Sequence, residues 1–211
     1  MKPIYVKLHL CVLLFIPSLA HGATILLSED FDELTATLGV TSAGAFTAIN
    51  GTNVDVVGAG DGFGALCAAP ESGNCLDLDG SGGNPQGQIQ SGPITLNPGT
   101  TYFLSFDLIG SGRGVTTSTT VNFGPYSQTF VLASGDVTSG IVVNQPITVG
   151  STTIANLDFT SNTSGQIGAV LDNVEVTAGT ASTVPEPSGM ALLTGPALLA
   201  AGVFARRLRR K

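Results

Sequence analysis

The sequence predicts an all-β fold, a jelly-roll β-sandwich that lies between two apolar terminal segments. Apolar and polar residues alternate in many short runs, which is typical of strands with one buried face. Turn-forming Gly, Pro, Asn and Ser clusters separate these runs. Residues 24–177 show no sustained apolar stripe of the helical period. That segment is long enough to bury one hydrophobic core, so we expect a single sandwich domain.

Residues 1–23 are predicted to be a secretory signal peptide. Lys2 and Lys7 precede an apolar stretch at 8–20, and small residues follow it. Two small-x-small sites place the expected cleavage between residues 20 and 24. Cys11 lies inside the apolar stretch, so we expect it to be removed with the peptide.

The clearest strand covers residues 102–109, and residues 115–123 alternate in the same way. In the first of these, Tyr102, Leu104, Phe106 and Leu108 share the face that we expect to be buried. Turns such as Asn97-Pro98-Gly99 separate it from its neighbours. Shorter runs predict further strands at 24–27, 46–49, 54–57, 76–78, 89–96, 127–133, 141–149, 152–159 and 167–177.

Cys67 and Cys75 remain after the signal peptide is removed. An even pair of cysteines in an oxidising compartment indicates a disulfide. The intervening residues are rich in turn formers, which lets the chain return on itself. A redox-active pair would favour the closer Cys-x-x-Cys spacing.

Residues 178–183 are small and polar and predict a flexible linker. Eighteen uncharged, mainly apolar residues follow at 188–205, and at about 1.5 Å each they reach about 27 Å, the thickness of a bilayer core. We therefore predict a single transmembrane helix there. The chain ends in a basic tail, 206–211, which should stay in the cytoplasm and leave the domain outside the inner membrane. Its cations are Arg206, Arg207, Arg209, Arg210 and Lys211.

Val184-Pro185-Glu186-Pro187, the apolar span and the basic terminus together resemble the PEP-CTERM sorting signal. Such signals occur on exported proteins of Gram-negative bacteria that make extracellular polysaccharide. The resemblance implies export through the Sec translocon and recognition by exosortase, a membrane-embedded cysteine protease thought to cut near the Pro-Glu-Pro box. It also implies an inner-membrane precursor and a final location in the outer envelope or extracellular matrix. The alternative is an ordinary C-terminal anchor.

The exported segment is strongly acidic. Residues 24–187 hold all fifteen carboxylates and one cation, Arg113, for a net charge of −14. Such a surface repels phosphate polymers, so nucleic-acid binding is excluded.

The segment also lacks the residues that most catalytic sites need. Both histidines lie in or beside the signal peptide, which excludes Ser-His-Asp and Cys-His nucleophiles and His-ligated zinc. A carboxylate-only glycoside hydrolase remains a remote alternative. Its candidates are Asp77, Asp79, Asp107 and Asp172. The chain has no Trp to form a sugar platform, so we expect a protein that is not an enzyme.

Two local patterns resemble galactose-binding-like jelly rolls. One begins Leu76-Asp77-Leu78-Asp79-Gly80 and the other is the closing strand at 169–176. This resemblance supports the fold, while such sandwiches bind sugars, bind calcium, or do neither.

Asp77 and Asp79 also look like the first half of a calcium loop, with oxygen ligands at alternate positions. Gln88 stands where an EF-hand has its bidentate Glu, so an EF-hand is not expected. We keep a looser calcium site on Asp77 and Asp79 as an alternative. The simpler interpretation is that Leu76 and Leu78 face the core and Asp79 opens a turn, and no other cofactor is expected.

We predict a structural or adhesive role, with carbohydrate binding, with or without calcium, as the alternative. Tyr126 is the one aromatic ring that we expect to be exposed and able to contact a glycan. Arg113 could contact a sugar, but we favour a role as charge partner of a nearby carboxylate. Ice binding is a remote alternative, because Thr116, Ser118 and Thr120 form only one short row.

Overall fold

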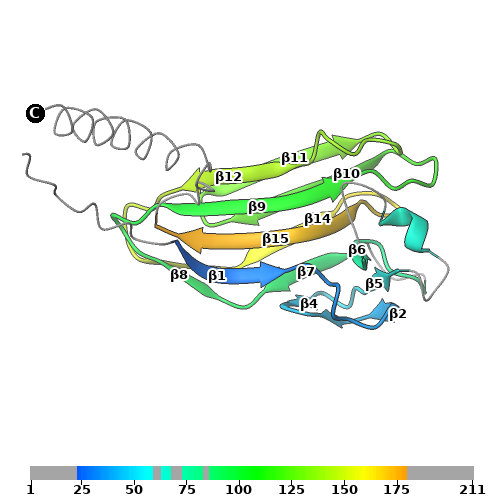
Figure 1. Ribbon diagram of the computed structural model, residues 1–211, viewed down its shortest axis with the longest axis horizontal. Coiled ribbons are helices and arrows are strands. Elements are labelled where there is room, and N and C mark those ends of the chain that lie inside the picture. The colour runs from blue at the N-terminus through cyan, green and yellow to red at the C-terminus, as the bar shows by residue number, and fades with distance from the viewer. Residues whose placement is uncertain (1–22, 59–62, 68–72, 83–85, 180–211) are drawn as a thin grey trace, which may run out of the picture.

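The computed structural model describes residues 23–58, 63–67, 73–82 and 86–179 of the chain. These residues form two antiparallel sheets packed face to face, as predicted for a β-sandwich (Figure 1). The predicted signal peptide, apart from Ala23, and the predicted sorting segment at 184–211 lie outside the described residues. Within the described ranges, no helix has the length and apolarity needed to span a bilayer.

The seven-stranded sheet has the order β12-β9-β15-β6-β5-β2. Its seventh strand, β1, pairs with the second half of β15, beyond the part that pairs with β6. The strands are β1 (Thr24–Glu29), β2 (Thr37–Val40), β5 (Val54–Val57), β6 (Cys75–Asp77), β9 (Tyr102–Ile109), β12 (Val142–Ile147) and β15 (Val170–Ala178).

The six-stranded sheet has the order β11-β10-β14-β7-β4-β3, and a separate pair joins β13 to β8. The edge strands β11 and β12 of the two sheets lie side by side along one margin of the molecule (Figure 1), which we call the open side. The strands are β3 (Ser42–Ala43), β4 (Phe46–Ala48), β7 (Gln88–Ser91), β8 (Ile94–Leu96), β10 (Thr117–Phe123), β11 (Tyr126–Leu132), β13 (Thr153–Ala155) and β14 (Leu157–Ser161).

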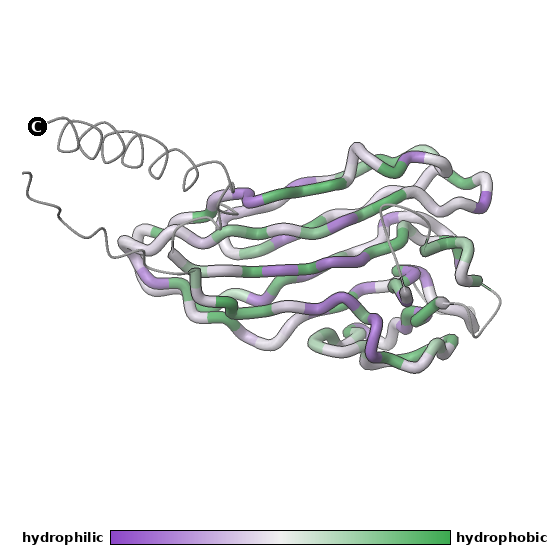
Figure 2. Tube along the Cα trace, in the orientation of Figure 1, coloured by the Kyte–Doolittle hydropathy of each residue, from purple (hydrophilic) through white to green (hydrophobic). Residues whose placement is uncertain are grey.

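The main core lies between the sheets and follows the predicted alternation. Along β9, Tyr102, Leu104, Phe106 and Leu108 are all 3% exposed or less, and hydrophobic and hydrophilic residues alternate along the long strands (Figure 2). The Phe106 ring packs edge-on against Phe159 of the facing sheet, with 5.3 Å between ring centroids. The prediction that Tyr102 faces inward is confirmed.

A second, smaller cluster covers part of the opposite face of the seven-stranded sheet. Val170 and Ile109 alternate with core residues of β15 and β9, and they pack with Val57 and the two cysteines. The predicted disulfide is present, with Cys67 following the short 3₁₀ helix Gly64–Leu66 and Cys75 opening β6. It holds the 3₁₀ helix close to that face of the sheet.

Two predicted strands were wrong in detail, and two short strands were not predicted. The predicted strand at 89–96 divides at Gly92-Pro93 into β7 and β8, and the one at 152–159 divides at Asn156 into β13 and β14. Each division moves the chain from one sheet to another. Strands β2 and β3 were not predicted, because four and two residues are too short to show an alternation.

Candidate functional site

The β10–β11 hairpin positions Tyr126 at the open side. Phe123 pairs with Tyr126, so Gly124 and Pro125 form a two-residue turn. Gly124 has φ of +56°, the conformation that hairpin turns with glycine at the first central position require. A Cβ at Gly124 would also lie 2.9 Å from the Leu96 side chain. The turn therefore needs glycine, and it fixes where the Tyr126 ring emerges.

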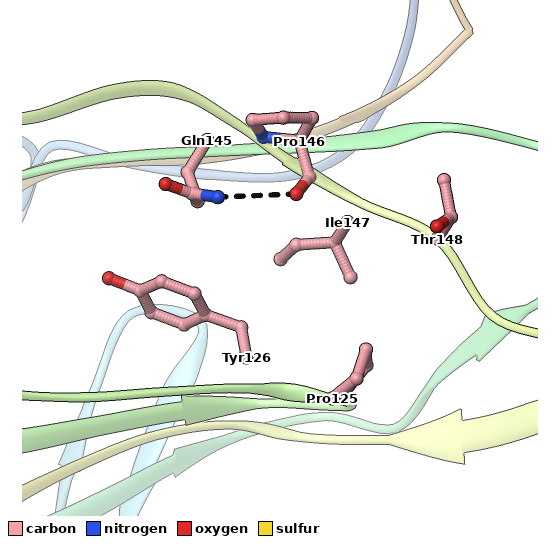
Figure 3. Close-up of a pocket in the computed structure, with 6 residues that line it drawn as sticks. All are labelled: Pro125, Tyr126, Gln145, Pro146, Ile147 and Thr148. Atoms are coloured by element: carbon pink, nitrogen blue, oxygen red, sulfur yellow. Dashed lines mark hydrogen bonds between the residues drawn. The ribbon is translucent and has the colours of Figure 1, made fainter.

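Tyr126 lines a cavity of about 290 Å³ between the ends of the two edge strands. Across the cavity, its ring lies opposite Gln145 and Ile147 of β12 (Figure 3). The Tyr126 hydroxyl donates to Gln128 Oε1 at 3.0 Å, and Gln145 Nε2 donates to the Pro146 carbonyl at 3.2 Å. The full lining is Pro125, Tyr126, Gln145, Pro146, Ile147 and Thr148.

Partial burial raises the pKa of the Tyr126 phenol above its usual value. The phenol thus stays protonated at neutral pH and keeps its hydrogen-bond donor. The cavity combines a partly exposed ring, two prolines, an amide and a hydroxyl, and none of its lining residues is charged. Such a lining can stack on the C–H face of a neutral ring and hydrogen-bond its hydroxyl groups.

Arg113 does not line this cavity. It follows β9 and precedes β10, whereas Tyr126 follows β10, so the two residues lie at opposite ends of that strand. The Arg113 guanidinium forms an ion pair with the Asp77 carboxylate and also donates to the Gln166 carbonyl at 3.4 Å. The interpretation of Arg113 as a charge partner is confirmed, and the structure does not bring it to the Tyr126 cavity.

Asp77 and Asp79 use both carboxylate oxygens in contacts with the protein. Asp77 Oδ2 accepts from Arg113, while its Oδ1 accepts from the Asp79 and Gly168 backbone N–H groups at 3.2 and 3.0 Å. Asp79 accepts from the Gly87 N–H and the Ser161 hydroxyl, both at 2.8 Å. A calcium ion on this pair would have to displace a guanidinium and a hydroxyl.

The described residues therefore fit a structural role for Asp77 and Asp79 better than a calcium site. In the described ranges, no three His, Cys, Asp or Glu side chains gather at metal-binding distance. Leu76 and Leu78 face the core, as the simpler interpretation requires. Asp77 and Asp79 are also buried, at 1% exposure each, which the sequence pattern did not predict.

Burial has a measurable effect on these two carboxyls. It raises the pKa of Asp77 from 3.8 to about 6, and the nearby Arg113 charge and the hydrogen bonds oppose that rise only in part. Burial likewise raises the pKa of Asp79. Asp77 lies on the face of β6 that carries the small cluster, which explains its loss of contact with water.

The carboxylates considered for hydrolysis do not form an accessible pair. Asp77 and Asp172 are each 1% exposed, and Asp107 accepts a hydrogen bond from Asn173 at 2.9 Å. None of the four candidates lines the Tyr126 cavity. In the row considered for ice binding, the Thr120 hydroxyl is hydrogen-bonded to the Thr129 hydroxyl of β11 at 2.9 Å. Thr117 and Thr119, on the opposite face of β10, are buried and point into the core.

Tyr126 was a candidate from the sequence, but the β12 residues opposite it were not. The cavity needs β11 and β12 to lie side by side although they pair with different neighbours, and no local pattern reports that arrangement. Gln145-Pro146 carries a weak signal, because proline inside a strand marks an edge.

No protein family matches this sequence, and neither does any curated protein. Among solved structures, the CBM22-1 xylan-binding domain from Paenibacillus barcinonensis matches with a TM-score of 0.42 and 16% identity, over 76% of this chain and 97% of that one. The K3 cleaved adhesin domain of Lys-gingipain from Porphyromonas gingivalis matches with a TM-score of 0.44 and 15% identity, over 74% of this chain and 99% of that one.

A third match, an exo-β-1,3-galactanase from Phanerochaete chrysosporium, gives a TM-score of 0.32 and 17% identity, over 73% of this chain and 29% of that one. Similarity at this level does not assign the chain to a family.

Proposed function

We propose that the described domain is a non-catalytic carbohydrate-binding module that holds an uncharged saccharide in the Tyr126 cavity. The observation that carries this proposal is the juxtaposition of the Tyr126 ring with Gln145 and Thr148 across one solvent-accessible cavity. An aromatic ring with a few polar groups that fix orientation is the chemistry by which proteins recognise sugar rings.

The charge of the described residues favours a neutral ligand. Arg113 is the single lysine or arginine in the described ranges, and its guanidinium is held by Asp77. A uronate or sulfated sugar would therefore meet an acidic domain with no available cation near the cavity. A neutral sugar needs only hydrogen bonds and ring contact.

The experiment measures the retardation of the purified full chain in gels that contain neutral or acidic polysaccharides. We expect neutral polymers to retard the protein and Tyr126→Ala to weaken binding by about tenfold or more, the loss of a ring contact of about 1.4 kcal/mol. Tyr126→Phe keeps the ring and should bind within about threefold of the wild type. Equal binding by Tyr126→Ala, or a preference for acidic polymers, would refute the proposal.

We further propose that the protein is exported and sorted to the outer envelope or extracellular matrix. The resemblance of residues 184–211 to the PEP-CTERM signal supports this, and so does a disulfide in an acidic domain. Cell fractionation with mass mapping of the C-terminus, in cells with and without the sorting protease, tests it. An intact C-terminus retained in the cytosol in both strains would contradict it.

A structural or adhesive role is the second candidate, and one observation favours it. The six-stranded sheet ends in an uncharged strand, β11, at the open side. Matrix proteins that assemble need such a contact surface.

A further inference from the structure

The edge strand β11 is long, regular and uncharged. Its seven residues pair with β10 from Thr117↔Leu132 to Phe123↔Tyr126 with no shift in register. The strand contains no charged residue and no proline. Among the described strands it has one neighbour, so its other side presents backbone N–H and C=O groups that can pair with another strand.

Every other described edge carries a feature that hinders such pairing. Strand β12 has a register shift, Asn144 at φ of +52° and Pro146, which cannot donate. Strand β1 has a shift in its pairing register and ends at the charged residue Glu29. Strand β2 has only four residues, and Gly39 lies within a register shift in its pairing with β5. Strands β3, β8 and β13 have two or three residues each. Natural proteins usually protect long edges in these ways, and β11 lacks all of them.

The carboxylates of the strands are divided unequally between the two sheets. Asp158 is the one charged residue in the strands of the six-stranded sheet, and its carboxylate accepts from the Gln90 amide at 2.8 Å. The strands of the seven-stranded sheet contain six carboxylate residues: Glu29, Asp55, Asp77, Asp107, Asp172 and Glu175. Two copies of so acidic a domain repel each other unless they meet along the uncharged part.

The open side is the part of the surface whose strands carry no charge. Strands β11 and β12 together hold no charged residue, and they expose two apolar side chains, Val131 at 67% and Val143 at 71%.

We propose that β11 pairs with β11 of a second copy of this chain. The pairing is antiparallel about a two-fold axis, which is the symmetry of most homodimers. If the axis passes at the central residue, Thr129, all seven residues of each strand are used and Thr129 lies opposite its counterpart. The two six-stranded sheets then become one continuous sheet, joined by main-chain hydrogen bonds.

This inference does not depend on glycan binding, because it concerns backbone pairing and is tested with no saccharide present. The failure of one proposal therefore leaves the other standing.

The test is sedimentation velocity of the full chain in mild detergent, from about 1 µM to about 1 mM, with three variants. Thr129→Lys and Thr129→Glu each place like charges opposite each other across the axis, and both should weaken the dimer by about tenfold or more. Thr160→Lys is the matched control. Thr160 and Thr129 both pair with Thr120 and so belong to one row across the sheet, but Thr160 lies on the interior strand β14.

We expect a wild-type dimer, a Thr160→Lys dimer of similar affinity, and monomers for both Thr129 variants at concentrations where the wild type is paired. Hydrogen exchange supplies a second measurement, since the amide groups of β11 should become more protected as concentration rises. A monomeric wild type overturns the proposal. So does a dimer that persists in both Thr129 variants or weakens equally in Thr160→Lys, because it must then use another surface.

Discussion

The burial of Asp77 beside Arg113 gives the folding free energy a pH dependence that one substitution removes. Asp77→Asn keeps an oxygen that can accept from the Asp79 and Gly168 N–H groups, but the side chain no longer titrates. The variant also loses the ion pair with Arg113, so its stability at any single pH is not the informative quantity. The informative quantity is how the difference in unfolding free energy between variant and wild type changes with pH.

The magnitude follows from the raised pKa of Asp77. Its pKa is about 6 in the folded protein against 3.8 for an unperturbed carboxyl, a difference worth about 3 kcal/mol. The folded state binds this proton more tightly than the unfolded state. The stabilisation is therefore complete below about pH 4 and is lost as pH rises to about 6. Relative to the wild type, Asp77→Asn should gain about 3 kcal/mol between those limits.

Urea denaturation of both proteins at half-unit steps from about pH 3.5 to about pH 7.5 measures this difference. The pKa of Asp79 is raised as well, but Asp79 is present in both proteins and its effect largely cancels. Arg113→Met supplies a second check, because loss of the guanidinium should raise the Asp77 pKa further and extend the pH-dependent loss above pH 6. Parallel curves for Asp77→Asn and the wild type would refute the reasoning.

Three further predictions concern stability, each read from denaturant unfolding. Replacing Cys67 and Cys75 by Ala should cost about 2.5 kcal/mol by the loop-entropy estimate, and an unchanged midpoint would show that the disulfide adds nothing. Gly168→Ala should lower the free energy of unfolding by about 1–3 kcal/mol, because the new Cβ would lie 2.5 Å from the Asp79 backbone nitrogen. Gly135→Ala is the control, since a Cβ at Gly135 meets no atom within 4 Å. Equal losses of stability in the two variants would contradict this reasoning. Thr119→Val should raise the free energy of unfolding by about 1 kcal/mol, because the Thr119 hydroxyl is buried without a hydrogen-bond partner among the described residues. A less stable variant would indicate that the hydroxyl does form a hydrogen bond.

The sequence predicted those parts of the fold that depend on neighbouring residues. The predicted strand at 102–109 matches β9 at both ends. Eight alternating residues between two turns fit the two-residue period of a strand and not the period of a helix. The disulfide was predictable because only two cysteines remain in the exported segment. The role of Arg113 as charge partner followed from its being the one cation among fifteen carboxylates.

Features that depend on contacts between distant segments could not be predicted. The alternation in Leu76-Asp77-Leu78-Asp79 suggests carboxylates facing water, but the 3₁₀ helix, the small cluster and the segments at Gly87 and Gly168 cover them. The Tyr126 cavity depends on β12, which is joined by pairing to β9 and not to β11. The breaks at Gly92-Pro93 and Asn156 mark a change of sheet, and a local pattern cannot say to which sheet the chain moves.

Because the strand carboxylates lie mostly in the seven-stranded sheet, the two broad sides of the sandwich should differ in negative potential. In an ionic medium the Debye length is about 8–10 Å, comparable to the spacing of about 10 Å between packed sheets, so a nearby polyanion or anionic lipid headgroup experiences the two broad sides differently. Beside such a surface the molecule should turn its hydroxyl- and amide-bearing side inward and its carboxylate side outward. Orientation would then be set by electrostatic torque alone, before any specific contact forms.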